Sequence, residues 1–345
     1  MKISDNVFRQ ATDGSLNDLP RHGDGPRRVR FTHILNPHVG KNIAHESALQ
    51  MLTFETIRSA IRMAEPAVSV RCVCVTLPGE TATVPRDFIT AKPLTRTVLD
   101  VAAFNEPSPL PLIFDVMDHG IAVPEAPPEN PGCEDFIIFS NTDIHLQPHF
   151  YLAILEFIRA GYDVIDIHRR GIPNHAPLVE DLSVMFSEVG IHHGGCDCIV
   201  FPRRMYGTFT RNNACIGRSF VMRAFVFNFV RHAKRYLILS NARLTFHIGN
   251  DRAWAIPSLT DYSAFNHAES KRVLSALSNE TAVANKMLSS FRAIGVGGNF
   301  IQTLEEAAGF VAPLPTLRRA VRRRFGRARR RLVRMIMGRL SRWQN

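Results

Sequence analysis

The stretch of sequence that decides the fold is Asp135-Phe136-Ile137-Ile138-Phe139-Ser140-Asn141-Thr142-Asp143. Its four consecutive apolar residues are typical of a strand that is buried on both faces of a central sheet. The polar group Asn141-Thr142-Asp143 follows directly at the carboxyl end of this strand. In an open α/β sheet, ligands bind beyond the carboxyl ends of the strands, so this turn is the first place to look for a site.

Segments with strand and helix signals alternate on both sides of this stretch. The other expected strands, read from alternating or β-branched apolar runs, are residues 29–35, 67–77, 162–168, 196–201 and 244–247. The expected helices, with apolar residues at helical spacing, are residues 46–64, 112–118, 148–158, 220–236, 271–291 and 304–311. This succession predicts an α/β fold with a Rossmann-like, mostly parallel central sheet flanked by helices.

The positive charge of the chain is concentrated at its C-terminus. The 345 residues carry a formal net charge of +11, but residues 317–345 contain twelve arginines and no acidic residue. The rest of the chain therefore carries −1, which is 11 less 12. A nearly neutral body with one cationic segment indicates that the segment, and not the body, contacts a polyanion.

Composition divides the chain into three parts. The polar composition of residues 1–28 predicts a flexible arm that is not a signal peptide. Residues 29–312 are expected to form one α/β domain, and residues 313–345 a tail. No stretch approaches the roughly 18 to 20 apolar residues of a membrane span. The six cysteines are interpreted as small buried hydrophobes in a reducing compartment, rather than as a zinc site or a disulfide framework.

Asp143 is the candidate site residue that the physical argument singles out. A carboxylate directly after a buried strand, flanked by Asn141 and Thr142, can bind a divalent metal through oxygen ligands. The alternative is that Asp143 caps the next helix or forms an Asx turn. The local sequence leaves both roles open.

Residues 136–144 resemble the central strand and metal-binding turn of the GT-A glycosyltransferases. In that family, an Asp-x-Asp motif holds Mn²⁺ or Mg²⁺ against the diphosphate of a nucleotide sugar. Here Asn141 stands at the first acidic position and only Asp143 keeps the carboxylate, which implies a weaker metal site or a metal-independent variant. The resemblance covers residues 29–260, implies a GT-A-like catalytic domain, and is more specifically to a bacterial group of GT-A-like proteins.

The resemblance also implies roles for residues elsewhere in the chain. His247 joins Asp143 as a ligand of the metal or diphosphate, and Asp197 is the general base. From the residues alone, His247 can instead be a buried strand histidine, and Asp197 a cap or the partner of an arginine. The residues expected to contact the nucleotide sugar are Asn36, Arg96, Asp100, Asn141, Thr142 and Arg252.

Residues 317–345 predict a basic amphipathic helix. On a helical projection, one apolar stripe is formed by Val321, Phe325, Ala328, Leu332, Ile336, Leu340 and Trp343. Arginines take the rest of the circumference, which is typical of a helix in the interface of an anionic membrane. An arginine-rich segment also suits nucleic acid, but the stripe favours the membrane. We therefore expect a cytoplasmic protein attached peripherally to the inner face of the membrane.

Three functions remain in view at this point, and one of them is a nucleic-acid-binding protein that acts through its arginine-rich tail. Neither a P-loop motif nor a Gly-x-Gly-x-x-Gly after the first strand occurs, which argues against P-loop and dinucleotide-binding proteins. The resemblance implies a metal-assisted glycosyltransferase that moves a sugar from a nucleotide-diphosphate sugar to a glycan or lipid-linked acceptor. The alternative is a non-catalytic GT-A-like binding protein that its arginine-rich tail recruits to a membrane or to nucleic acid.

Overall fold

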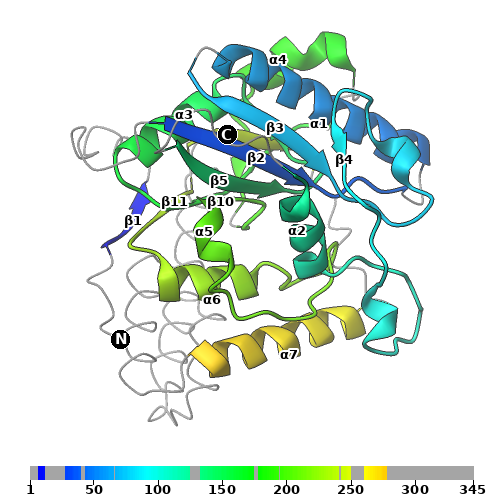
Figure 1. The fold of residues 1–345 in the computed structure, drawn as a ribbon. Helices are drawn as coiled ribbons and strands as arrows, with labels where there is room; N and C mark the ends of the chain where they lie inside the picture. The colour runs from blue at the N-terminus through cyan, green and yellow to red at the C-terminus, as the bar shows by residue number, and fades with distance from the viewer. Residues whose placement is uncertain are drawn as a thin grey trace, which may run out of the picture.

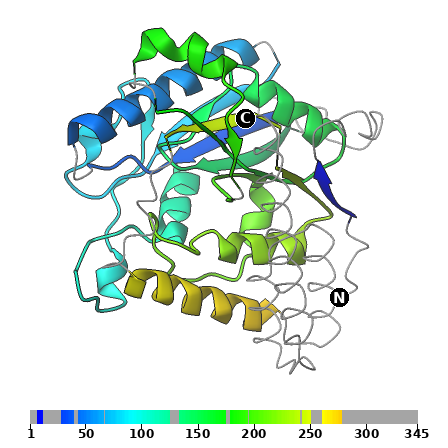
Figure 2. The same ribbon diagram turned by 180° about the vertical axis from the view of Figure 1, so that it is seen from behind.

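The computed structural model describes residues 7–11, 28–39, 43–65, 67–124, 133–174, 178–193, 195–240, 242–249 and 260–277. Across them, a large central sheet has helices on both faces (Figures 1 and 2). A smaller sheet follows the ends of the central strands. The expected α/β fold with a Rossmann-like, mostly parallel central sheet is confirmed.

The central sheet has eight strands, and one of them runs against the rest. Their order is β1 (Val7–Ala11), β11 (Arg235–Leu239), β7 (Val164–Ile167), β10 (Cys198–Pro202), β5 (Cys133–Ser140), β2 (Arg28–Leu35), β3 (Ser69–Cys74) and β4 (Ile89–Thr90). β10 pairs antiparallel with β5 and β7, whereas the other neighbours pair in parallel. Its first residue, Cys198, therefore lies opposite Ser140 and Ile167, the last residues of β5 and β7. This register places the loop before β10 at the carboxyl edge of the parallel strands.

A second sheet of four short strands begins at the same edge. Its order is β6 (His145–Leu146), β12 (Thr245–Ile248), β8 (Arg170–Ile172) and β9 (Ile191–His192). β6 follows β5 and β8 follows β7 after short turns, and β12 pairs with both β6 and β8. The late strand β12 is thereby brought across the turns that end the central strands.

Helices cover both faces of the central sheet. They are α1 (Ile43–Ala64), α2 (Ile113–Ala122), α3 (Phe150–Arg159), α4 (Leu182–Ser187), α5 (Arg203–Tyr206), α6 (Arg223–His232) and α7 (Thr260–Leu277), with the 3₁₀ turns η2 (Thr81–Thr83), η3 (Val98–Asp100) and η4 (Val179–Asp181). Phe54 of α1 and Phe150 of α3 are buried in one core, and Phe114 of α2 and Phe225 of α6 in the other. The strands β2, β3, β5, β7, β10 and β11 contribute to both cores, because alternate side chains of a strand point to opposite faces.

Several element boundaries differ from those expected. The helix expected over residues 220–236 ends at His232, because the apolar residues that follow pair as β11 with β7. The helix expected at 271–291 begins earlier, at Thr260. The arm expected over residues 1–28 includes β1, which pairs in parallel with the open edge of β11. An unpaired strand edge offers backbone groups that favour such pairing.

Other expectations lie outside the described residues and stay predictions. These are the helix at 304–311, the domain boundary at residue 312, the tail 313–345 with its amphipathic helix, and the role of Arg252. Within the described part of the chain, no helix is both long and apolar enough to cross a membrane.

Gly120 marks a close approach of α2 to the sheet, and it gives a test of the fold. A Cβ added to Gly120 would lie 2.7–2.9 Å from three side-chain carbons of Ile34, which is fully buried in β2. We predict that Gly120→Ala lowers the free energy of unfolding by about 1–3 kcal/mol, the usual cost of overpacking, despite the higher helix propensity of alanine. Chemical denaturation measures this change.

Gly207→Ala is the matched control. Gly207 has a helical φ of −63° at the end of α5, and nothing lies within 4 Å of its added Cβ. This substitution should leave the free energy of unfolding unchanged or slightly raised. A Gly120→Ala protein as stable as the Gly207→Ala protein would contradict the close packing of α2 on β2.

Candidate functional site

The turn after β5 is held from two sides. The Asn141 N–H donates to the carbonyl of Asp197, in the loop before β10, at 3.4 Å. On the other side, the Thr53 hydroxyl of α1 donates to the Thr142 carbonyl at 2.8 Å. The Ile144 N–H closes the turn on the Asn141 carbonyl at 3.2 Å. The backbone of the turn is therefore fixed between α1 and the loop that carries Asp197.

The structure brings together Asp143 and His247, the two residues expected to ligate a metal. Nε2 of His247 lies 3.3 Å from Oδ2 of Asp143, and Nδ1 of His247 lies 3.2 Å from the Gly249 carbonyl oxygen. The contact with a carbonyl places a proton on Nδ1. In a neutral ring, Nε2 is then an acceptor that faces a carboxylate, another acceptor. The arrangement requires a second proton on the ring or a cation between the two side chains.

Asp143 is ionised and incompletely satisfied. Burial raises the pKa of its carboxyl group, but the hydrogen bond and charge of His247, together with Arg169, outweigh burial and lower the pKa to about 2. The side chain is 44% exposed, yet its Oδ1 is enclosed and has no hydrogen-bond partner among the described residues. An enclosed carboxylate oxygen without a donor is costly, so this atom fits a bound cation. Carboxylate and imidazole together suit Mn²⁺ better than Mg²⁺, which prefers oxygen ligands.

His145 lies next to this pair and was missed by the sequence analysis. It is fully buried in β6, its ring stacks on Phe246, and neither ring nitrogen has a hydrogen-bond partner in the described ranges of the chain. Burial, followed by the charge of His247, lowers the pKa of His145 to about 4 and keeps the ring neutral at neutral pH. The available signal was a histidine two residues after Asp143.

A buried hydrogen-bond chain supports the turn from inside the sheet. Nε2 of His33 lies 2.8 Å from the Ser140 hydroxyl, and its Nδ1 lies 2.8 Å from the Tyr151 hydroxyl. All three side chains are fully buried. Since Ser140 is the last residue of β5, the chain links β2 and α3 to the start of the turn. Burial lowers the pKa of His33 to about 3, so the ring is neutral.

Asp197, the expected general base, lies beside the turn. Its Oδ2 is 3.5 Å from Nε of Arg169 and 3.7 Å from Nδ1 of His193. Oδ2 is enclosed but makes no hydrogen bond to any residue that the structure describes. The contact with Arg169 is the one expected if Asp197 only pairs with an arginine, which was the alternative to a general base. A loosely held carboxylate beside an arginine can still accept a proton, so both roles are compatible.

Arg169 is a cationic residue of the site that the sequence analysis did not name. It is 7% exposed, it lies between β7 and β8, and its charge acts on Asp143 as well as on Asp197. A guanidinium group held at such a place suits a diphosphate. The signal was present, because Arg169 directly follows an expected strand at the carboxyl edge.

The expected nucleotide contacts are only partly at this edge. Asn36 is buried just after β2, and its side-chain amide donates to the Val75 carbonyl at 2.7 Å. This bond ties together the ends of the chain segments that leave β2 and β3. Asn141 and Thr142 lie in the turn itself. Arg252 lies outside the described residues.

Arg96 and Asp100 have local partners instead. Arg96 forms two hydrogen bonds, of 2.6 and 2.9 Å, with the carboxylate of Asp115 in α2. Asp100 accepts from the N–H of Thr97 at 2.7 Å and completes the cap of η3. These contacts hold the segment after β4 and do not join either residue to the Asp143 turn. Their expected role toward the nucleotide stays a prediction.

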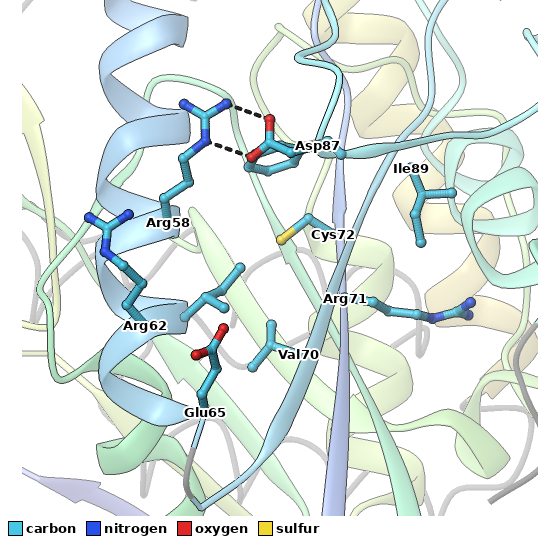
Figure 3. A pocket seen from close by; sticks show the side chains of 10 residues that line it. Arg58, Arg62, Glu65, Val70, Arg71, Cys72, Asp87 and Ile89 are labelled. Carbon is cyan, nitrogen blue, oxygen red and sulfur yellow. Dashed lines mark hydrogen bonds and ion pairs between the residues drawn. The ribbon is translucent and has the colours of Figure 1, made fainter.

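A cavity of about 400 Å³ lies elsewhere, between α1 and the edge of the sheet at β3 and β4 (Figure 3). Its lining residues are Arg58, Ile61, Arg62, Glu65, Val70, Arg71, Cys72, Asp87, Phe88 and Ile89. Arg58 and Asp87 form two hydrogen bonds across it, of 2.7 and 2.6 Å. None of the expected site residues lines this cavity, so the candidate site is the turn at the carboxyl edge.

Comparison with known proteins finds likeness in structure only. The sequence matches no protein-family model and no curated protein. The chain is similar to 4-diphosphocytidyl-2C-methyl-D-erythritol synthase of Anaerococcus prevotii, at 9% identity and a TM-score of 0.34, over 69% of this chain and 98% of that one. It is also similar to a candidate nucleotide-diphospho-sugar transferase of Desulfovibrio desulfuricans, at 12% identity and a TM-score of 0.32, over 72% of this chain and 98% of that one. A third similar structure is HddC of Yersinia pseudotuberculosis, at 10% identity and a TM-score of 0.30, over 61% of this chain and 90% of that one. At these values the likeness carries no argument about activity, and the residue roles depend on the geometry of the site.

The buried hydrogen bonds of His33 with Ser140 and Tyr151 make the stability of the fold depend on pH. The pKa of His33 falls from 6.5 in the unfolded chain to about 3 in the fold, so the unfolded state binds more protons between these values. We predict that stability is lost as the pH falls below about 6.5, with His33 contributing about 1.4 kcal/mol between about pH 7.5 and pH 5.5. Chemical denaturation at both pH values measures the loss, which His33→Gln should reduce by that amount.

His38→Gln is the control for this measurement. The His38 side chain is 49% exposed, so its replacement should leave the pH dependence of the wild type in place. His145, which is also buried with a lowered pKa, acts in the same direction and keeps part of the dependence in the His33 variant. The interpretation fails if the His33→Gln and wild-type proteins lose the same free energy on acidification.

Proposed function

We propose that this protein is a metal-assisted glycosyltransferase, which moves a sugar from a nucleotide-diphosphate sugar to a glycan or lipid-linked acceptor. The observation that supports the proposal is the contact of Asp143 with His247 at the carboxyl edge of the sheet. There, an ionised carboxylate faces an imidazole, and Oδ1 of Asp143 lacks a partner. This edge is where open α/β sheets bind their ligands.

Asp143 and His247 are the residues that would hold the metal. When bound, the ion would neutralise the charge that develops on the diphosphate leaving group. The carbonyl of Gly249 orients the ring of His247, as outer partners of metal-binding histidines do. Arg169, buried beside both carboxylates of the site, would add a fixed positive charge for the diphosphate.

Asp197 is proposed as the general base. In an inverting transfer, the acceptor hydroxyl loses its proton while its oxygen bonds to the sugar and the bond to the diphosphate breaks. The carboxylate of Asp197 would take that proton. The hydrogen bond from Asn141 to the Asp197 carbonyl ties the base to the turn that would hold the metal. This backbone hydrogen bond would hold the proposed base at a fixed position relative to the proposed metal ligand.

We predict that Asp143→Asn abolishes metal-dependent binding of the donor. Thermal unfolding is measured with a panel of nucleotide-diphosphate sugars and nucleoside triphosphates, with and without Mn²⁺. A ligand at 100 times its Kd adds about 2.7 kcal/mol of stability. For a chain of this size, that raises the Tm by about 4 °C. One nucleotide-diphosphate sugar should produce this shift in the wild type, only with Mn²⁺, and the variant should lose it.

Asp197→Asn is the matched control at the neighbouring carboxylate. It should keep the metal-dependent shift, because Asp197 acts on the acceptor, while turnover falls by about 10²–10⁴-fold. An equal shift in Asp143→Asn and wild type would overturn the metal role of Asp143. No shift with any donor in folded protein would favour the non-catalytic binding protein. A triphosphate-specific shift with release of pyrophosphate would instead indicate nucleotidyl transfer.

We also propose that residues 317–345 attach the protein to the inner, anionic face of the membrane, where a lipid-linked acceptor would be found. The support is the sequence pattern of twelve arginines around one apolar stripe. Deletion of residues 317–345 should release the protein from vesicles that contain anionic lipid, because each basic residue contributes about 1 kcal/mol near such a surface. Co-sedimentation measures release. Undiminished sedimentation of the truncated protein, or complete displacement of the full chain from vesicles by RNA, would contradict this attachment.

A further inference from the structure

A second cluster of metal-ligating side chains lies at the end of β7. Asp166 is in β7, His168 follows the strand, and Cys196 lies in the loop before β10. One ligand atom from each of the three lies within 4.8 Å of those of the other two. The antiparallel pairing of β10 with β7 brings these segments together. None of the three belongs to the Asp143–His247 pair.

The carboxylate of Asp166 is the buried member of this cluster. It is 1% exposed, and its Oδ2 accepts from the Cys196 thiol at 2.9 Å and from the Tyr236 hydroxyl at 3.1 Å. Its Oδ1 is enclosed and, within the part of the chain that the structure describes, has no hydrogen-bond partner. A buried carboxylate in this condition needs a proton or a cation. The two possibilities differ in a measurable way, because a cation that binds there would also bind the Cys196 sulfur.

A fourth donor lies next to the cluster. Nδ1 of His168 is 3.3 Å from Nε2 of His192 in β9, and the two rings stack with 5.5 Å between their centroids. The two nitrogens share a hydrogen bond here, and His192 is not one of the three residues whose ligand atoms lie within 4.8 Å of one another. His192 is exposed at the surface, so an ion can reach this side of the cluster from solvent.

We propose that Asp166, His168 and Cys196 form a zinc site, separate from the site at Asp143. Thiolate, imidazole and carboxylate are the ligands that Zn²⁺ takes, and three protein ligands leave one position for His192 or water. On binding, the Cys196 thiol releases its proton to solvent and its sulfur bonds to the ion. Cys196 is then an exception to the interpretation of the cysteines as inert buried hydrophobes.

The consequence of such a site concerns Asp197. Cys196 immediately precedes Asp197, whose carbonyl accepts from Asn141 of the turn. An ion held by β7 and by Cys196 would fix the loop before β10 at one more point. The zinc site would therefore position the proposed base without touching the substrate. The existence of the site does not depend on the proposed transferase activity.

Cobalt substitution tests the site directly. The full-length protein is freed of metal with a chelator and titrated with Co²⁺. A cobalt ion bound to a thiolate shows a charge-transfer band in the near ultraviolet, whereas an ion at Asp143 and His247, which offer no sulfur, does not. One equivalent of Co²⁺ should produce the band, and Zn²⁺ should remove it. No band in folded protein at saturating Co²⁺ would overturn the proposal.

Variants separate the two candidate metal sites. Cys196→Ser should lose the band, while Asp143→Asn and Cys133→Ser should keep it, since Cys133 is a half-buried thiol at the start of β5. His168→Ala keeps the hydrogen bond between Cys196 and Asp166 and serves if the Cys196 variant does not fold. The Kd of the His168→Ala protein for Co²⁺ should rise by more than about tenfold. Loss of an outer-shell partner alone lowers metal affinity by about 10- to 100-fold, and loss of a direct ligand should cost at least as much. A band of wild-type strength in Cys196→Ser, or unchanged affinity in His168→Ala, would show that the ion binds elsewhere.

Discussion

The reversal of β10 is the constraint on which the candidate site depends. Because β10 runs antiparallel between β5 and β7, the loop before it lies where the parallel strands end. In a parallel orientation, the residue before β10 would lie at the opposite edge, a whole strand length from the turn. The reversal alone therefore brings Asp197 to Asn141, and Cys196 to Asp166. Both the proposed base and the proposed zinc ligand owe their place to this one strand.

Neutral buried groups surround the charged residues of the site. His33 and His145 are fully buried with strongly lowered pKa values, so neither adds charge at neutral pH. The charged groups that act on one another at this edge are Asp143, Asp197, Arg169 and the ring of His247. Electrostatic interactions strengthen where solvent is excluded, so a few charges at this edge act strongly on one another. His247, and after it Arg169, lower the pKa of Asp143 more than burial raises it.

The strand over residues 135–140 and its polar turn were predictable because a long apolar run is a local signal. The contact between Asp143 and His247 was anticipated from a resemblance and not from spacing, since about a hundred residues separate them. β11 was not expected, and only its first two residues, Arg235 and Tyr236, fell within the end of the expected helix over residues 220–236. In the second sheet, β12 was expected at residues 244–247, whereas β6, β8 and β9 have only two or three residues, which is too short for periodicity to appear. His145 was missed because it belongs to one of these short strands, whereas Arg169 directly follows an expected strand and could have been named.

The asparagine at position 141 changes the charge balance of the site in a way that Arg169 complements. An aspartate there would place a third carboxylate beside Asp143 and Asp197, and like charges in a partly buried site raise one another's pKa. With Asn141, one carboxylate faces His247 and the other lies 3.5 Å from Arg169. An incoming diphosphate, itself anionic, then meets less repulsion from the protein. Asn141 is thus consistent with a site in which a weakly held metal ion and a buried arginine share the stabilisation of the leaving group.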